Sequence, residues 1–213
     1  VGSIASLNCG GATHNGTLID GSMANAVSSA ISYTEGDGGG YPEQSIASTG
    51  VTGLTASIAA GILASGTGTL TYTITGTPSA AGTASFDLII GGQTCTLTRT
   101  ILPVGTITSI NCGGAIHNGI LINGSITNDV SSAISYTEGD GGGYPAQNIA
   151  STGVMGLTAS VAAGVLSSGA GTVTYTITGT PSAAGTASFA ITLGGQTCTL
   201  TRTVLPVGSI TAL

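Results

Sequence analysis

Few side chains in this sequence could carry out chemistry, and most of them occur twice, 103 positions apart. His14 and His117 each stand in a His-Asn-Gly sequence, and a histidine can act as a general base. No nucleophile with a supporting acid can be assigned to either histidine. The sequence contains no GxSxG, HExxH or phosphate-binding loop motif. We therefore interpret both histidines as surface turn residues, and we predict no enzymatic activity and no cofactor.

Acidic residues in a glycine-rich segment form a second group. The sequence Glu-Gly-Asp-Gly-Gly-Gly occurs once in each half, and carboxylates are among the oxygen ligands that Ca²⁺ prefers. The spacing differs from that of an EF-hand loop, and a good calcium site needs more carboxylates. A solvated turn is therefore the favoured interpretation, with calcium as a weak alternative. The four acids are Glu35, Asp37, Glu138 and Asp140.

Arg99 and Arg202 are the only basic residues of the chain. In a strand, Arg99 falls on the same face as Leu97, which is expected to point inward, and a buried cation should meet an anion. Asp87 cannot serve both arginines, because its counterpart in the second half is Ala190. The predicted partners in a structural ion pair are acids present in both halves, namely Glu35 or Asp37 for Arg99 and Glu138 or Asp140 for Arg202.

These positions recur because the chain is a tandem repeat. Residues 1–103 return as residues 104–206 without insertion or deletion, and 81 of the 103 positions are identical. Residues 207–213 start a third copy, so the chain is expected to be part of a longer array. We predict one domain over 1–103 and a second over 104–206.

The composition excludes several classes of protein. Charged residues make up 5% of the chain, against roughly 25% in ordinary globular proteins. Two arginines and no lysine exclude a nucleic-acid-binding surface and a polybasic membrane contact. No apolar run approaches the ~18 residues of a membrane span, so no membrane insertion is predicted.

Strands are the elements that must position these residues. Residues 69–75 alternate threonine with apolar side chains, and 84–90 and 94–101 alternate in the same way around a Gly-Gly turn. We predict that these three strands form a β-meander. Residues 3–9, 27–33, 46–48 and 54–58 are further strand candidates, although 56–63 could instead form a helical turn. Seven or eight short strands in each copy favour an all-β fold of two β-sandwich domains.

A family resemblance rests on the second half of each copy. Gly53-Leu54-Thr55, followed by LTYTITGT at 70–77 and PSAAGTASF at 78–86, resembles the immunoglobulin-like repeats of large bacterial surface proteins. The 103-residue unit is also similar to tandem repeats in giant secreted proteins of Bacteroidetes. Thr55 stands where that family usually has proline. The resemblance implies immunoglobulin-like sandwiches in an extracellular array, without enzymatic activity.

The cysteines fit this resemblance, since the first and last strands of an immunoglobulin-like sandwich can lie side by side. A bond within each copy is the favoured of the three possible pairings, and it implies an oxidising, extracellular setting. A bond from Cys95 to Cys112 across the junction and buried free thiols are the alternatives. The favoured pairs are Cys9–Cys95 and Cys112–Cys198.

The junction and the polar faces complete the sequence-based picture. Leu102-Pro103-Val104 contains no flexible linker, so we expect domains packed end to end as a rod. The regularly spaced threonines are expected to face solvent, with ice binding disfavoured by sheet twist and O-glycans as an option. Asn15 and Asn123 begin weak N-glycosylation sequons.

These observations favour a structural repeat unit of an extracellular bacterial filament or surface stalk, with copies of itself as partners in end-to-end or lateral assembly. The alternative is an adhesin module that contacts glycan, host protein or ice. Tyr41-Pro42 is the only candidate aromatic patch for such binding.

Overall fold

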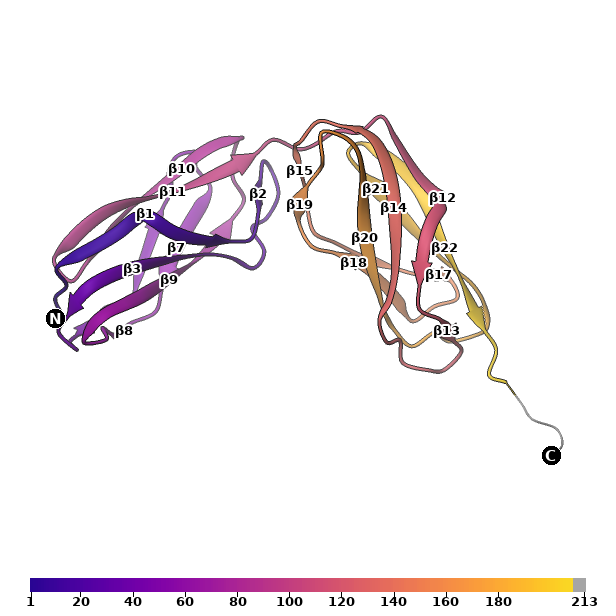
Figure 1. Ribbon diagram of the computed structural model, residues 1–213, viewed down its shortest axis with the longest axis horizontal. Helices are drawn as coiled ribbons and strands as arrows, with labels where there is room; N and C mark the ends of the chain where they lie inside the picture. Colours follow the sequence, from indigo (N-terminus) through magenta and orange to yellow (C-terminus); the bar gives the residue numbers. More distant parts are fainter. Residues whose placement is uncertain (209–213) are drawn as a thin grey trace. The chain divides into compact units, whose positions relative to one another are not determined.

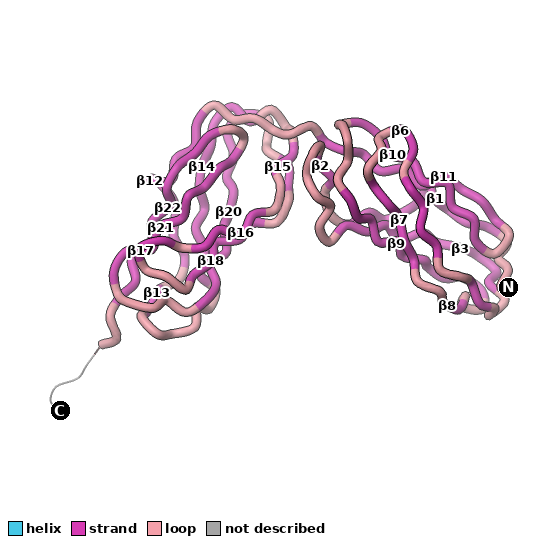
Figure 2. The backbone as a smooth tube through the Cα atoms, turned by 180° about the vertical axis from the view of Figure 1, so that it is seen from behind, coloured by secondary structure: helices cyan, strands magenta, loops and turns pink. Residues whose placement is uncertain are grey.

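The computed structural model describes residues 1–208, and within that range all regular structure is β-strand (Figures 1 and 2). The chain divides into two compact units, Val1–Pro103 and the part that starts at Val104. The predicted start of a third copy lies mostly outside the described residues. Each unit is a β-sandwich, so the predicted all-β fold of two tandem sandwich domains is confirmed.

The two units have the same strands in the same order. Unit 1 contains β1 (Ser6–Asn15), β2 (Leu18–Ile19), β3 (Val27–Gly36), β4 (Gly40–Tyr41), β5 (Gln44–Ala47), β6 (Thr49–Gly50), β7 (Leu54–Ile58), β8 (Gly61–Ile62), β9 (Gly66–Gly76), β10 (Gly82–Ile90) and β11 (Gln93–Leu102). Unit 2 contains β12 (Ser109–Asn118), β13 (Leu121–Ile122), β14 (Val130–Gly139), β15 (Gly143–Tyr144), β16 (Gln147–Ala150), β17 (Thr152–Gly153), β18 (Leu157–Val161), β19 (Gly164–Val165), β20 (Gly169–Gly179), β21 (Gly185–Leu193) and β22 (Gln196–Leu205).

Two sheets face each other in each unit. In unit 1 the first sheet has the order β1-β3-β9-β7-β5 and the second has the order β2-β11-β10-β6, while β4 and β8 form a separate short pair at one end. All of these pairs are antiparallel except β2 with β11. Unit 2 repeats this topology strand by strand.

The core lies between the sheets and is built by the period-2 alternation of the strands. On β9, Leu70, Tyr72 and Ile74 are buried and the intervening threonines are exposed. On β10, Phe86 is fully buried in the same way. Aromatic side chains are few, so the core consists mainly of aliphatic residues.

Two expectations about the strands are corrected. The predicted β-meander is wrong, because β9 belongs to the first sheet whereas β10 and β11 form a hairpin in the second. The chain leaves the first sheet at Gly76, whose φ of 106° favours glycine and whose added Cβ would lie 2.2 Å from the Gly53 carbonyl. The helical turn suggested for 56–63 is also wrong, because β7 and β8 are strands separated by Ala59 and Ala60.

Candidate functional site

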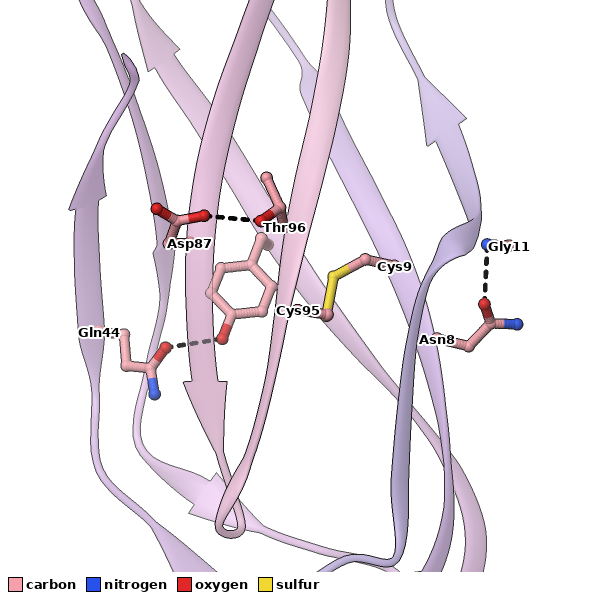
Figure 3. The surroundings of a disulfide bond; sticks show 8 residues. Asn8, Cys9, Gly11, Gln44, Asp87, Cys95 and Thr96 are labelled. Carbon is pink, nitrogen blue, oxygen red and sulfur yellow. Dashed lines mark hydrogen bonds between the residues drawn. A yellow bond between two sulfur atoms is a disulfide. The ribbon is translucent and has the colours of Figure 1, made fainter.

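The sheets are joined on one side of each unit by a disulfide. Cys9 on β1 bonds Cys95 on β11, with the two Cα atoms 5.9 Å apart, and Figure 3 shows the bond crossing between the strands. Cys112 and Cys198 form the corresponding bond in unit 2. All four cysteines are therefore used within their own units, and the cross-junction bond from Cys95 to Cys112 is not formed.

Cys9 lies at the start of a β-bulge in the first strand and shares the inward-facing phase of Leu7. The register of β1 against β3 shifts between Asn8 and Thr13, so the intervening residues have no partner in the ladder. The Asn8 side-chain oxygen accepts a hydrogen bond from the Gly11 backbone N–H at 3.0 Å, which closes the bulge (Figure 3). Cys9 is buried, whereas Asn8, Gly10 and Gly11 beside it are exposed.

A buried arginine makes a second connection, from β11 to β3 and to the turn after β1. Arg99 on β11 faces inward, as its phase predicts. Its Nη1 donates to the Ser28 carbonyl at 2.8 Å and to Ser29 Oγ at 3.1 Å. Its Nη2 donates to the Gly16 carbonyl at 2.7 Å. The equivalent acceptors of Arg202 in unit 2 are Ser131, Ser132 and Gly119.

The predicted ion pairs between these arginines and the loop acids are wrong. The guanidinium donors point at backbone carbonyls of the turn after β1 and of β3, and these oxygens supply the negative charge density that an acid was expected to provide. Burial lowers the pKa of Arg99 from its usual value. Glu35, Asp37, Glu138 and Asp140 therefore have other roles.

His14 extends the arginine network. Its Nδ1 lies 2.9 Å from Ser29 Oγ, and His117 stands in the same relation to Ser132. Because Ser29 Oγ accepts from Arg99, its own hydrogen is available for His14 Nδ1, which favours a neutral imidazole. Burial, followed by the charge of Arg99, lowers the pKa of His14. His14 lies within β1 and not in a turn, which corrects the sequence-based interpretation.

A serine beside a histidine has the residue types of a nucleophile and its base, but the geometry does not fit catalysis. Ser29 and Ser132 have no exposed surface. Each hydroxyl is already bonded to an arginine and a histidine of its own unit. A substrate cannot reach such a hydroxyl, so the arrangement is a structural network.

The opposite side of the sandwich is closed by a glutamine that the sequence analysis did not identify. Gln44 on β5 donates through Nε2 to the carbonyl of Ile89 on β10, and its Oε1 accepts a hydrogen bond from Tyr72 Oη at 2.8 Å (Figure 3). Burial, together with the nearby Tyr41, raises the pKa of Tyr72 to about 12. Unit 2 repeats the arrangement with Gln147, Tyr175 and Thr192. An inward tyrosine whose hydroxyl needs a partner is the only sequence signal for it.

The glycine-rich loops hold the first residues of each unit. Asp37 accepts hydrogen bonds from Ser3 Oγ at 2.9 Å and from the Gly39 N–H at 2.8 Å. These bonds lower the pKa of Asp37. Asp140 makes the same kind of contact with Thr106 and Gly142, and Glu138 accepts a bond from Thr108. In residues 1–208 no three His, Cys, Asp or Glu side chains are grouped for a metal, and Glu35 lies exposed with a φ of 53°.

The remaining predicted positions lie on the surface. The threonines of β9 and β11 face solvent on the outer sides of the two sheets. Asn15, at the end of β1, is exposed, whereas Asn123, in the turn after β13, is partly buried. Tyr41 is half-buried and packs against the core, which leaves little aromatic surface for a ligand.

Comparison with known proteins adds a weak structural likeness. No family model matches the chain, and no curated protein matches its sequence. The chain is similar to the structure of surface layer protein SbsC, domains 1–6, with a TM-score of 0.29 and 14% identity. That match covers 97% of this chain and 36% of the SbsC chain, so this chain spans about a third of its length. No helix among residues 1–208 is long and apolar enough to cross a membrane.

The arginine network yields a stability prediction. We expect Arg99→Ala to lower the free energy of unfolding by about 3 kcal/mol, because the buried Ser29 hydroxyl and the part-buried carbonyls around it lose their donor at about 1–3 kcal/mol each. Urea unfolding of the whole chain measures this. Glu35→Ala is the matched control and should change stability by less than about 0.5 kcal/mol. Energetic coupling between the two substitutions in a double-mutant cycle would indicate an ion pair between Arg99 and Glu35, and it would contradict the network.

The histidines yield a pH prediction. The folded pKa of His14 and of His117 lies below the unfolded value of 6.5, so the unfolded chain takes up these protons first as the pH falls. This contribution to stability is complete above pH 6.5 and decreases as the pH falls from 6.5 to the folded pKa. Urea unfolding at pH 7.5 and pH 5 should show the decrease. The double variant His14→Gln/His117→Gln should lack it.

Asp37 and Asp140 do not interfere with that measurement. Their pKa values are lowered from 3.8, so their contribution is lost only at still lower pH. An unchanged decrease between pH 7.5 and pH 5 in the double histidine variant would show that other groups cause it.

Proposed function

We propose that each 103-residue unit is a structural, non-catalytic repeat of an extracellular array, either a filament body or a surface stalk, and that its partners are copies of itself. The observation that carries the proposal is the disulfide that joins the first and last long strands of each unit. This bond makes every repeat a separately locked module and leaves no cysteine for other chemistry. Disulfides of this kind persist in oxidising, extracellular settings.

The outer faces of the sheets support the same proposal. On the β10–β11 hairpin, Thr83 stands opposite Thr100 and Ser85 opposite Thr98, so hydroxyl groups of neighbouring strands form rows. Few charges interrupt these faces, and low charge reduces the repulsion that keeps proteins apart. Such surfaces suit lateral contact between copies, and they offer hydroxyls to which glycans can be attached.

An enzymatic role and an adhesin role are both less well supported than a structural repeat. In the Ser–His pair of each unit, the serine hydroxyl is buried and is already hydrogen-bonded to the arginine and the histidine of that unit. The candidate aromatic patch at Tyr41 is packed against the core of its own unit, so a glycan or protein partner would find few exposed aromatic anchors.

Electron microscopy of the native, unreduced material tests this proposal. We expect unbranched filaments or rods that extend over many repeats. Filaments of variable length with a regular axial repeat indicate a filament body, and rods of fixed length with a terminal knob indicate a stalk. Isolated particles the size of one or two sandwich domains would contradict both forms of the proposal.

A further inference from the structure

Unit 2 exposes a cluster of apolar side chains at the end where the chain leaves its last strand. We call it the end patch, and it consists of Ile120, Ile122, Ile126, Met155 and Leu205. Ile126 is 83% exposed and Ile120 is 68% exposed. Single exposed apolar residues are common, but a group of them at one place marks an interaction site.

Backbone contacts connect the segments that carry these residues. Ile122 on β13 pairs in parallel with Leu205 on β22, and the Asn123 N–H donates to the Leu205 carbonyl at 2.9 Å. The Gly124 N–H donates to the Pro181 carbonyl. The next residue, Ser182, donates its N–H to the Met155 carbonyl at 3.0 Å. In Figure 1, β13 lies beside the end of β22, where the chain leaves the unit.

The fold does not require all of this apolar surface, as unit 1 shows. Three of the five positions are apolar there too, as Ile19, Met23 and Leu102, and the other two are not. The positions of Ile120 and Met155 are threonines in unit 1, Thr17 and Thr52, and the two units nevertheless share one topology. The position of Asn123 is an aspartate, Asp20, so the second copy has also lost a charge here. In a pair of copies that agree at 81 of 103 positions, these differences alter the chemistry of one end.

The opposite end of each unit offers a surface of matching chemistry. There the β4–β8 pair of unit 1 presents the exposed Ile62, with Val1 also exposed. In unit 2 the same end exposes Val104 and Val165. Val104 and Tyr144 also line a hollow of about 220 Å³ there, together with Pro145, Leu193 and Gly194.

We propose that the end patch docks against the N-terminal end of a further copy of this repeat, a proposal that rests on the array function given above. Residues 207–213 match residues 1–7 at five of seven positions and follow directly on Leu205-Pro206. In both units the start of this segment builds the N-terminal end, through Gly2 N–H to the Gly40 carbonyl and Gly105 N–H to the Gly143 carbonyl, both at 2.7 Å. A following copy would therefore have its N-terminal end tethered beside the patch.

The tether sets the affinity that the contact needs. A short connection gives an effective concentration of the order of millimolar, so a dissociation constant of about 1 mM is sufficient in an array. The same contact between separate chains must then be measurable at millimolar protein. Because the end patch and the N-terminal end are different surfaces, every complex still has one free end patch and one free N-terminal end. The complexes therefore grow as linear chains.

Sedimentation equilibrium of the 213-residue chain, from micromolar to about 2 mM, tests the proposal because this range brackets that affinity. We expect oligomers that grow in number and size with concentration. The double variant Ile120→Thr/Met155→Thr carries the residues that unit 1 has at these positions, so it should fold. Its dissociation constant for self-association should be at least about tenfold higher. Ile116→Thr is the matched control, since it removes an equally exposed isoleucine from β12, outside the patch, and Thr13 occupies that position in unit 1.

Three results would overturn the inference. The chain could remain monomeric up to 2 mM, it could stop at a dimer that the patch variant abolishes, or Ile116→Thr could weaken association as much as the double variant does. A dimer would mean that the patch pairs with itself. If native filaments are seen by microscopy while the chain stays monomeric, the array function stands and only this docking surface fails.

Discussion

The sandwich of each unit depends on the connections that hold its last strand to its first two long strands, which in unit 1 are β11, β1 and β3. The Cys9–Cys95 bond joins β1 to β11, and four residues further along β11 the Arg99 guanidinium reaches the turn after β1 and the backbone of β3. Gln44 closes the other side by connecting β5 with β10 and Tyr72. A core with few aromatic side chains gains less from burial than usual, so these connections determine how the two sheets face each other.

The same arrangement accounts for the absence of accessible chemistry at the residues that looked most reactive. The cysteines are oxidised, the serine hydroxyl is enclosed, and the histidine is hydrogen-bonded to that hydroxyl. Asp37 holds the first residues of its unit in place. The exposed groups include rows of hydroxyls on the outer faces and apolar side chains at the ends, and the proposed contact between copies rests on these.

Period-2 alternation predicts the strands and the inward direction of Cys95, Leu97 and Arg99, and the structure places all three as expected. The sequence does not show which sheet a strand joins, because the glycine and proline after β9 indicate only that the strand ends. The partners of Arg99 could not be predicted either, since most of them are main-chain carbonyls, which every residue has and which therefore carry no sequence signal. Gln44 was missed because a single glutamine in a short strand looks like a surface residue.

We propose that the disulfide locks each repeat as a separate module. Urea unfolding of Cys9→Ala/Cys95→Ala, with unit 2 left intact as an internal reference, tests it most directly. The bond closes a loop of sequence separation 86, so unit 1 should lose about 4–5 kcal/mol of unfolding free energy and unfold at a lower urea concentration than unit 2. Coincident unfolding of the two units at the original midpoint would contradict the account.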